Sequence, residues 1–564
     1  MAIELSISHA VNAAGWLLAA TVLWFGYRAY VVRSHFQRLQ RQGVPMLPHH
    51  PILGHLGVVG KLMKDMPGDV HGDYLMLLIQ DNWRTLFDEK YTACPPAVYL
   101  DMWPASMPFM LSLHPDMSAQ FTQDVNMEKA EAQGHFLRPL TSNLDVASSH
   151  GAAWKKLRRR MNLGFSAQAI RARLPALMEE VEVFRDILVS RAGKNGAWGT
   201  VFTLEELATM LTLDFIGRFT FDVRLHEQTS PLTPMTAAML DTLPRLRVFT
   251  HIGNVWSLFN PWVTYKLWSN VRCMDAYLAP RLEERRAALT AGEPPAGGTT
   301  LVDTLFTTIA AESPADANTT ATLDYVVAET KHTLFAGHET TAFTLAWLFR
   351  TLATEPTIVA NMMAEHDAVL GPDPDAAADR LRDAPHLIGQ LPYTTAVIKE
   401  SMRIHTNVGT LRAAPPGAAL YGPAGSGYDG VAFPTDMCVL WDANFAIHRN
   451  PAYWPRPLEF VPERWLTTDK DDPLHPRRNA YRPFEQGPRN CVGQHMAMTE
   501  MTMVLALVVR TLEVEEAWAE WDAKRGATHK KKATVWGDRL YQVSKHGPPH
   551  VKDGMPVHVR LRQR

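Results

Sequence analysis

The sequence of 564 residues predicts a mainly α-helical body with small β-sheets (the α+β class), preceded by one N-terminal transmembrane helix. Residues 5–27 contain no Asp, Glu, Lys or Arg, and about 20 apolar residues span a bilayer as a helix. Residues 324–354 run without proline, which predicts a helix of roughly 45 Å. Apolar and aromatic runs at 98–112, 540–543 and 556–561 are typical of short strands, and we expect the last two to form one small sheet.

Charge and cysteine content narrow the class of protein. The formal net charge is −2 and the pI about 6.9, so no global basic field favours nucleic acid as a partner. A hydrophobic content of 46% is enough to fill a large core. The cysteines are too few and too scattered for a disulfide framework, which indicates a reducing compartment for the body. They are Cys94, Cys273, Cys438 and Cys491.

The N-terminal apolar run has the charge asymmetry of a membrane anchor. Only Glu4 precedes it, and the positive-inside tendency places everything after residue 32 in the cytosol. A cleaved signal peptide is the weaker alternative because the n-region is not basic and the apolar run is long. A buried helix of the body is the third alternative. We therefore expect 1–32 to be an uncleaved anchor, followed by a basic segment with Arg33, Arg38 and Arg41.

The next part of the chain connects the anchor to the body. Residues 33–55 are basic and then rich in proline, with a proline at about every third position of 45–54. Such spacing favours a stiff, extended connection. We expect 33–55 to be a hinge and 56–564 to be one large domain.

Two segments of the body carry aromatic and basic residues in informative positions. A helix beginning near residue 153 places Trp154 and Arg158 on one face, at i and i+4. The alternative for that helix is an ordinary solvated basic surface. Residues 248–268 hold a second aromatic group that is either core or a segment dipping into a membrane interface. Its members are Trp256, Phe259, Trp262, Tyr265 and Trp268.

The long helix predicted at 324–354 has a polar break in its middle. Gly337 costs roughly 1 kcal/mol relative to Ala in a helix interior. A carboxylate and hydroxyls there are costly when buried without partners, so Glu339 and Thr340 suggest a functional break in the helix. The alternative is a threonine bonded back to its own helix, with Glu339 in a surface salt bridge.

One loop near the C-terminal end carries the sharpest signal: Phe484-Glu-Gln-Gly487-Pro-Arg489-Asn-Cys491-Val-Gly493. A zinc or disulfide site is excluded because no second cysteine lies nearby. The glycines indicate a backbone that bends sharply or approaches another group closely. A thiolate beside free backbone N–H groups can bind a soft metal, and the guanidinium fork can bind a carboxylate. This combination fits a haem, whereas a partly buried structural cysteine is the plain alternative.

All five fixed positions of the haem-binding loop of the cytochrome P-450 family are matched, by Phe484, Gly487, Arg489, Cys491 and Gly493. The chain resembles that family from about residue 40 to the end. The resemblance implies a cytochrome P-450 fold with a long central oxygen-binding helix. It also implies that Cys491 is the axial iron ligand, and that Arg489, Trp154 and Arg158 bind the haem propionates. Phe484, Gly487 and Gly493 would shape the loop.

Two further groups are assigned by the same resemblance. Glu339 and Thr340 resemble the family's acid–alcohol pair, with Gly337 allowing O₂ to approach the backbone. The E-x-x-R pair Glu400 and Arg403, together with Arg464, resembles a buried structural clamp that braces the cysteine loop. Arg412 is a weaker candidate for a propionate. Residues 425–430 formally read G-x-G-x-x-G, but no helix follows, so we expect a hairpin turn.

The implied activity is haem-thiolate monooxygenation of a lipophilic small molecule. The implied cofactors are haem b and O₂, with electrons from NADPH through a separate NADPH–cytochrome reductase. We expect a single-pass protein of the endoplasmic reticulum membrane with a cytosolic, monomeric body and no nucleic-acid partner.

Alternatives to this activity stay open at this stage. They are an isomerase or dehydratase that does not use O₂, a hydroxylase of lipids, sterols or xenobiotics, and a non-catalytic haem sensor. The block at 537–542 resembles filamentous-fungal members that tailor secondary metabolites of the polyketide or terpenoid type. That likeness is associational.

Overall fold

The computed structural model describes residues 2–246, 260–293, 298–526, 533–544 and 548–563. As predicted, the body is mainly helical with small sheets. The helices of the first half are α1 (Ala2–Arg41), α2 (Leu56–Leu62), α3 (Asp73–Asp81), α4 (Trp83–Leu86), α5 (Pro115–Ala119), α6 (Glu131–Thr141), α7 (Gly151–Gly164), α8 (Ala167–Arg191), α9 (Leu204–Phe221) and α10 (Pro234–Leu246).

The second half contributes the longest helices of the body. They are α12 (Pro261–Thr290), α13 (Leu301–Glu312), α14 (Thr320–Thr354), α15 (Pro356–Leu370), α16 (Ala377–Asp383), α17 (Pro392–Ile404), α18 (Asn444–Ile447), α19 (Gln494–Val508) and α20 (Trp518–Lys524). Single helical turns include η7 (Pro462–Trp465) and η8 (Lys552–Gly554).

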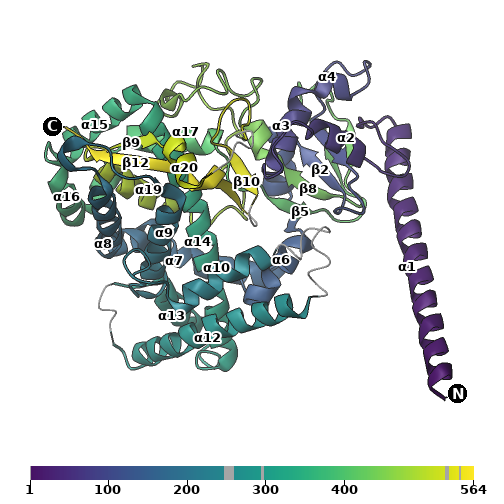
Figure 1. The fold of residues 1–564 in the computed structure, drawn as a ribbon, viewed down its shortest axis with the longest axis horizontal. Helices are drawn as coiled ribbons and strands as arrows, with labels where there is room; N and C mark the ends of the chain where they lie inside the picture. Colours follow the sequence, from purple (N-terminus) through teal and green to yellow (C-terminus); the bar gives the residue numbers. More distant parts are fainter. Residues whose placement is uncertain (1, 247–259, 294–297, 527–532, 545–547, 564) are drawn as a thin grey trace.

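The largest sheet has five strands in the order β1-β2-β8-β5-β3, and only its β2–β8 pair is parallel. Its strands are β1 (Ala97–Leu100), β2 (Phe109–Ser112), β8 (Val439–Asp442), β5 (Leu411–Ala413) and β3 (Glu128–Lys129). In Figure 1 this sheet lies with α2, α3 and α4 at one side of the molecule, and most of the helices lie at the other.

The remaining strands form three small antiparallel sheets. The first has the order β4 (Phe202–Thr203), β12 (Pro556–Leu561), β9 (Leu512–Glu516), and the others are the hairpins β6 (Ala419–Tyr421) with β7 (Ala432–Pro434) and β10 (Gln542–Ser544) with β11 (Pro549–Val551). Residues 425–430 lie in the predicted hairpin turn. The expectation that 540–543 and 556–561 share one sheet is wrong. β10 pairs with the next segment of chain, whereas β12 pairs with the distant β9.

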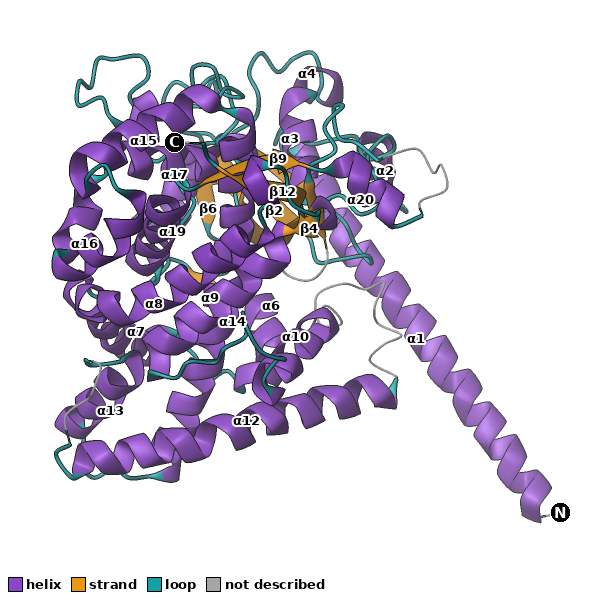
Figure 2. Ribbon diagram, turned by 60° about the vertical axis from the view of Figure 1, so that its left-hand side comes forward, coloured by secondary structure: helices purple, strands orange, loops and turns teal. Residues whose placement is uncertain are grey.

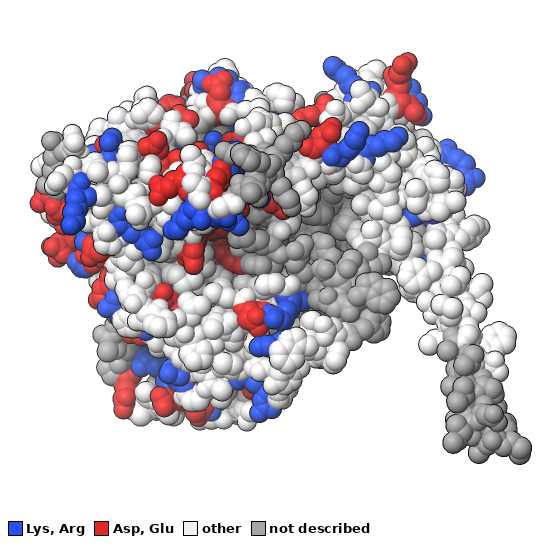
Figure 3. All heavy atoms as spheres, in the orientation of Figure 1, with Lys and Arg blue, Asp and Glu red and all other residues white. Residues whose placement is uncertain are grey.

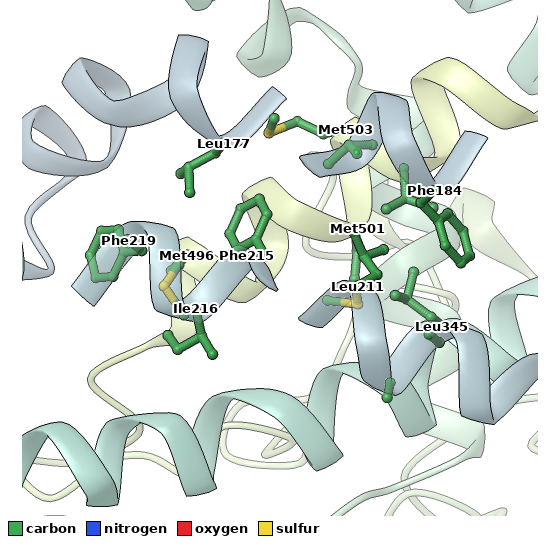
Figure 4. Close-up of a cluster of buried hydrophobic side chains, with 14 of the residues drawn as sticks. Leu177, Phe184, Leu211, Phe215, Ile216, Phe219, Leu345, Met496, Met501 and Met503 are labelled. Atoms are coloured by element: carbon green, nitrogen blue, oxygen red, sulfur yellow. The ribbon is translucent and has the colours of Figure 1, made fainter. Parts of the chain in front are cut away.

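The central helix α14 crosses the body and is buried along most of its length. It ends at Thr354, as predicted, and begins four residues before the predicted start because the Thr319 side chain caps it by accepting the Thr322 N–H. Helix α9 packs against α8 and α14, and Figure 4 shows Phe215 and Ile216 of α9 inside the main apolar cluster. The buried Met496, Met501 and Met503 of α19 fill gaps in the same core.

Helix α1 projects from the body over most of its length (Figures 1 and 2). Gly15–Arg41 is long and apolar enough to cross a membrane. Residues 33–41, which the sequence places in the hinge, continue the helix. Val32 and Phe36 are buried against the body, and Arg33 forms a buried ion pair with Asp101. The end of α1 is therefore fixed to the five-stranded sheet side of the molecule.

The aromatic segment at 248–268 is only partly described. Trp256 and Phe259 lie outside the described residues. Trp262, Tyr265 and Trp268, in the first turns of α12, are 58%, 50% and 55% exposed, so the core interpretation is wrong for these three. This end of α12 lies toward the side along which α1 extends in both ribbon views.

Candidate functional site

The cysteine loop leads directly into the N-terminus of α19. The Cys491 N–H donates to the Phe484 carbonyl oxygen at 2.8 Å, and the Gly493 N–H donates to the Cys491 sulfur. Burial raises the pKa of the Cys491 thiol, against the lowering effects of that hydrogen bond, Arg158 and Lys129. The residue nevertheless has accessible surface. Cys491 therefore opens onto space inside the fold, where cations and a backbone donor favour the thiolate.

Gly487 shows why this loop needs glycine. Its φ is +87°, and a Cβ there would lie 2.1 Å from the Thr122 carbonyl oxygen. Gly493 has no such backbone requirement, but a Cβ there would lie 3.9 Å from the Cys491 sulfur. The expected close backbone approach is thus present at Gly487, whereas Gly493 keeps side-chain atoms away from the sulfur. Phe484 packs partly buried against the main core.

Helix α7 is joined to the cysteine loop through Trp154 and Arg158. Arg158 donates from Nη1 to the Asn490 carbonyl oxygen at 2.5 Å and from Nη2 to Asn490 Oδ1 at 2.6 Å. The Arg489 guanidinium lies 4.1 Å from the centroid of the buried Trp154 ring. A solvated basic surface is therefore the wrong interpretation for these two α7 residues, which pack against the residues flanking Cys491.

A group of basic side chains lies beside the Cys491 sulfur. One of them, Lys129, was not predicted from the sequence. Lys129 and Arg412 stand directly opposite each other in the β3–β5 register. Burial lowers the pKa of Lys129 to about 7, assisted by Arg412, and burial lowers that of Arg412 to about 10. Lys129 Nζ donates to Thr410 Oγ1 at 2.7 Å, and Arg412 Nη1 donates to the Met127 carbonyl oxygen at 3.1 Å.

This cation group fits a haem. Like charges directly opposite on paired strands destabilise each other. Within the described residues, Arg412 Nε and Nη2, Arg158 Nε and Arg489 Nε are buried without a hydrogen-bond partner. Such donors call for anionic acceptors. A haem brings two propionate carboxylates and an iron for the neighbouring thiolate. Arg489 already holds Glu128 and the Ser149 carbonyl oxygen through its two terminal nitrogens, so Nε is its buried nitrogen without a partner.

The two polar residues predicted in the middle of α14 lie in different surroundings: Thr340 faces the interior space, and Glu339 is buried. Ala336 is exposed in the middle of a buried helix and Thr340, one turn later, is half-buried. Thr340 Oγ1 donates to the Ala336 carbonyl oxygen at 2.9 Å, which is the back-bonded arrangement. Glu339 is buried, and its Oε1 lies 3.6 Å from His550 Nε2. The surface salt bridge considered for Glu339 is therefore wrong.

Gly337 has a packing reason that the sequence did not suggest. A Cβ there would lie 2.9 Å from Ile216 Cγ1 on α9. Its missing side chain lets α9 and α14 approach closely. An approach of O₂ to its backbone stays a prediction.

The predicted clamp residues come together in the interior. Glu400 accepts from Arg403 Nη2 at 2.8 Å and from Arg464 Nε at 3.0 Å, and all three side chains are fully buried. Arg403 Nη1 also donates to the His448 carbonyl oxygen at 2.7 Å. His448 Nε2 in turn accepts the Arg482 N–H at 2.9 Å, two residues before Phe484. The clamp is thus linked to the start of the cysteine loop.

Comparisons with known proteins agree with this arrangement. The family model for "Cytochrome P450" matches residues 78–534. The chain is 34% identical over 97% of its length to "Cytochrome P450 monooxygenase polC" of Polytolypa hystricis, covering 94% of that protein. It is 31% identical over 88% of its length to "Cytochrome P450 monooxygenase acrF" of Aspergillus aculeatus, covering 99% of it. The cytochrome P450DA heme domain has a similar fold, with a TM-score of 0.65 at 19% identity, covering 92% of this chain and 96% of that one.

Proposed function

Because this chain belongs to the cytochrome P450 family and is a monooxygenase, we propose that it inserts one atom of O₂ into a lipophilic substrate in fungal secondary metabolism. The reaction is a hydroxylation, epoxidation or oxidative rearrangement, on a substrate of the polyketide or terpenoid type. One observation carries the proposal: the Cys491 thiol opens onto interior space beside a cation group. The two fungal relatives support the biological setting.

When bound, haem b supplies an iron at which O₂ is activated, and a thiolate ligand favours O–O cleavage. Cys491 provides that thiolate. Lys129, Arg158 and Arg412 would hold the propionates, with Trp154 and Arg489 packed beside them. Phe484, Gly487 and Gly493 shape the loop. Glu400, Arg403 and Arg464 maintain it and support incorporation of the haem.

The acid–alcohol pair holds and moves protons on α14. Thr340 Oγ1 bonds to the Ala336 carbonyl oxygen in the resting arrangement, and rotation about χ1 turns the hydroxyl toward the interior space. Glu339, the residue next to Thr340, is buried and acts as the proton donor of the pair. The complete acid–alcohol pair argues against an isomerase or dehydratase, because neither of these enzymes has to deliver protons to O₂.

Electrons come one at a time from a membrane-bound NADPH–cytochrome reductase. The surface that supports this proposal is on α7, the helix that contacts Asn490 beside Cys491. Lys155 and Lys156 are exposed there, whereas Arg159 and Arg160 are paired with Glu312. The two lysines provide a small cationic patch for an acidic flavoprotein.

We place the protein in the endoplasmic reticulum membrane as a single-pass, monomeric enzyme. Residues 1–32 form the anchor, 33–55 the connection and 56–564 the cytosolic haem domain. The exposed aromatics at the start of α12 rest in the same membrane interface and bring the body close to lipophilic substrates. The face drawn in Figure 3 carries acidic and basic side chains intermixed.

The test combines the full-length protein and a reductase with NADPH, ¹⁸O₂ and mixed polyketide and terpenoid extracts. The expected result is a product that contains one ¹⁸O atom and is lost without O₂ or NADPH. Conversion of the extract under nitrogen would instead establish an isomerase or dehydratase. A sensor would bind haem without consuming NADPH. Lauric acid and ergosterol assayed in parallel identify a lipid or sterol hydroxylase.

A further inference from the structure

A buried histidine connects the acid of the acid–alcohol pair to a second carboxylate. His550, on β11, lies between α14 and α9: its Nε2 is 3.6 Å from Glu339 Oε1, and its Nδ1 is 3.0 Å from Glu205 Oε1. The three side chains are 11%, 4% and 6% exposed, in the order His550, Glu339, Glu205. Glu205 Oε1 also accepts the Val551 N–H at 3.2 Å, which fixes the carboxylate to the same strand.

The geometry requires a proton between His550 and Glu339. With Nδ1–H donating to Glu205, the neutral ring turns the lone pair of Nε2 toward the Glu339 carboxyl. That contact is favourable only when either Nε2 or Glu339 carries the proton, because two lone pairs repel. At 3.6 Å, a small rotation of the carboxyl or one bridging water completes the hydrogen bond. Glu205 stabilises the imidazolium when the proton is on the ring.

The hairpin that carries His550 also reaches solvent. A hollow of about 410 Å³ is lined by Val543, the residue paired with His550 in the β10–β11 register, and by Lys552 and Asp553 just beyond β11. Both charged residues have their own partners, since Lys552 pairs with Asp69 and Asp553 with Arg525. His338, the histidine next to Glu339 on α14, is engaged elsewhere, because its Nδ1 bonds to the Leu334 carbonyl oxygen.

We propose that His550, oriented by Glu205, is a positioning and proton-relay residue that recharges Glu339 from solvent. This inference rests on the proposed monooxygenase function. Glu339 gives up its proton toward Thr340, and the Nε2–H of the His550 imidazolium reprotonates Glu339. Nδ1–H stays bonded to Glu205, so Nε2 is the atom that regains a proton, from water that enters at the β10–β11 hairpin. No electron moves in the relay.

Oxygen consumption without added substrate reports on this relay. Reduction of O₂ to hydrogen peroxide uses one NADPH and one proton from the medium, whereas reduction to two waters uses two NADPH and two protons. Water formation instead of peroxide release requires that protons be delivered into the site in step with the electrons. The NADPH oxidised per O₂ consumed therefore measures the proton supply and needs no knowledge of the substrate.

The variants are His550→Gln, which keeps a hydrogen-bonding side chain but removes the ring that can be protonated, and Glu205→Gln, which removes the negative charge. The matched controls are His558→Gln, a histidine that also contacts two glutamates, and Glu206→Gln, from the same turn as Glu205. Full-length proteins loaded with haem are compared by NADPH and O₂ consumption with the reductase. We expect His550→Gln to slow water formation about tenfold and to raise its solvent isotope effect. Both controls should match wild type.

A second readout is independent of turnover. The carbonyl stretch of the protonated Glu339 carboxyl, identified by its loss in Glu339→Gln, is followed against pH by infrared spectroscopy. Removing the imidazolium should move its titration midpoint upward, because a cation stabilises the carboxylate. An unchanged midpoint together with unchanged NADPH per O₂ in His550→Gln overturns the relay. If wild type binds haem but consumes no O₂, the proposed function fails while the infrared titration still tests the His550–Glu339 contact.

Discussion

Replacing Glu400 with alanine should destabilise the haem domain strongly. Its carboxylate is fully buried and accepts hydrogen bonds from Arg403, Arg464, Trp465 Nε1 and the Val461 N–H. The substitution leaves two guanidinium groups buried without their counter-ion. Breaking a buried charge set in this way costs about 3–5 kcal/mol, which is more than about a hundredfold in the folding equilibrium.

The assay is the fraction of full-length protein that carries haem after matched expression, together with its rate of thermal inactivation. The control is Glu459→Ala, which removes an i,i+3 partner of Arg456 at 3.3 Å on the surface, with the two side chains 49% and 61% exposed. That exposed pair is worth less than about 1 kcal/mol. Equal haem content and equal inactivation rates for Glu400→Ala and Glu459→Ala would refute the reasoning.

Two other predictions concern the loop and the pH range. Gly487→Ala should abolish haem incorporation because its Cβ would lie 2.1 Å from a carbonyl oxygen. Gly371→Ala, at the same φ of +87° but with no atom within 4 Å of its Cβ, should cost only the backbone strain of about 1–3 kcal/mol and keep the haem; carbon monoxide difference spectra distinguish the two variants. Burial lowers the pKa of His332, but Asp145 and Glu329 outweigh it and raise the pKa to about 9. Its contribution to stability is full below pH 6.5 and is lost as the pH rises through 9; the raised pKa of Glu329 has the same sign. The unfolding temperature should therefore fall from pH 6.5 to 9, less steeply in His332→Gln, and parallel profiles would contradict this.

Much of the helical framework was predictable because its signals are local. The Glu355–Pro356 pair marks the end of α14, and the E-x-x-R spacing of Glu400 and Arg403 places both on one helical face. The cysteine loop was predictable for a different reason: it brings a phenylalanine, two glycines, an arginine and a cysteine close together in a fixed order, and that combination is rare. The family resemblance then supplied the roles of its residues.

Residues brought together from distant segments were not predictable from local patterns. Lys129 sits in a two-residue strand and gains its meaning only opposite Arg412, on the partner strand. His550 and Glu205 are separated by 345 residues, and nothing near either one signals the other. The same reason explains the wrong assignment of the last strands to one sheet, because β12 pairs with β9 across a long interval. Gly337 was informative as a break in α14, but its packing against Ile216 depends on the path of α9.

The most direct test of haem-thiolate ligation is the carbon monoxide spectrum of the reduced, full-length protein compared with that of Cys491→His. The account predicts the red-shifted Soret band of a thiolate complex for wild type. It predicts that Cys491→His loses that shift even where it retains haem, while Cys438→Ala, at a buried cysteine elsewhere, keeps it. A Cys491→His protein that still shows the thiolate band would contradict the assignment of the iron ligand and of the site built around it.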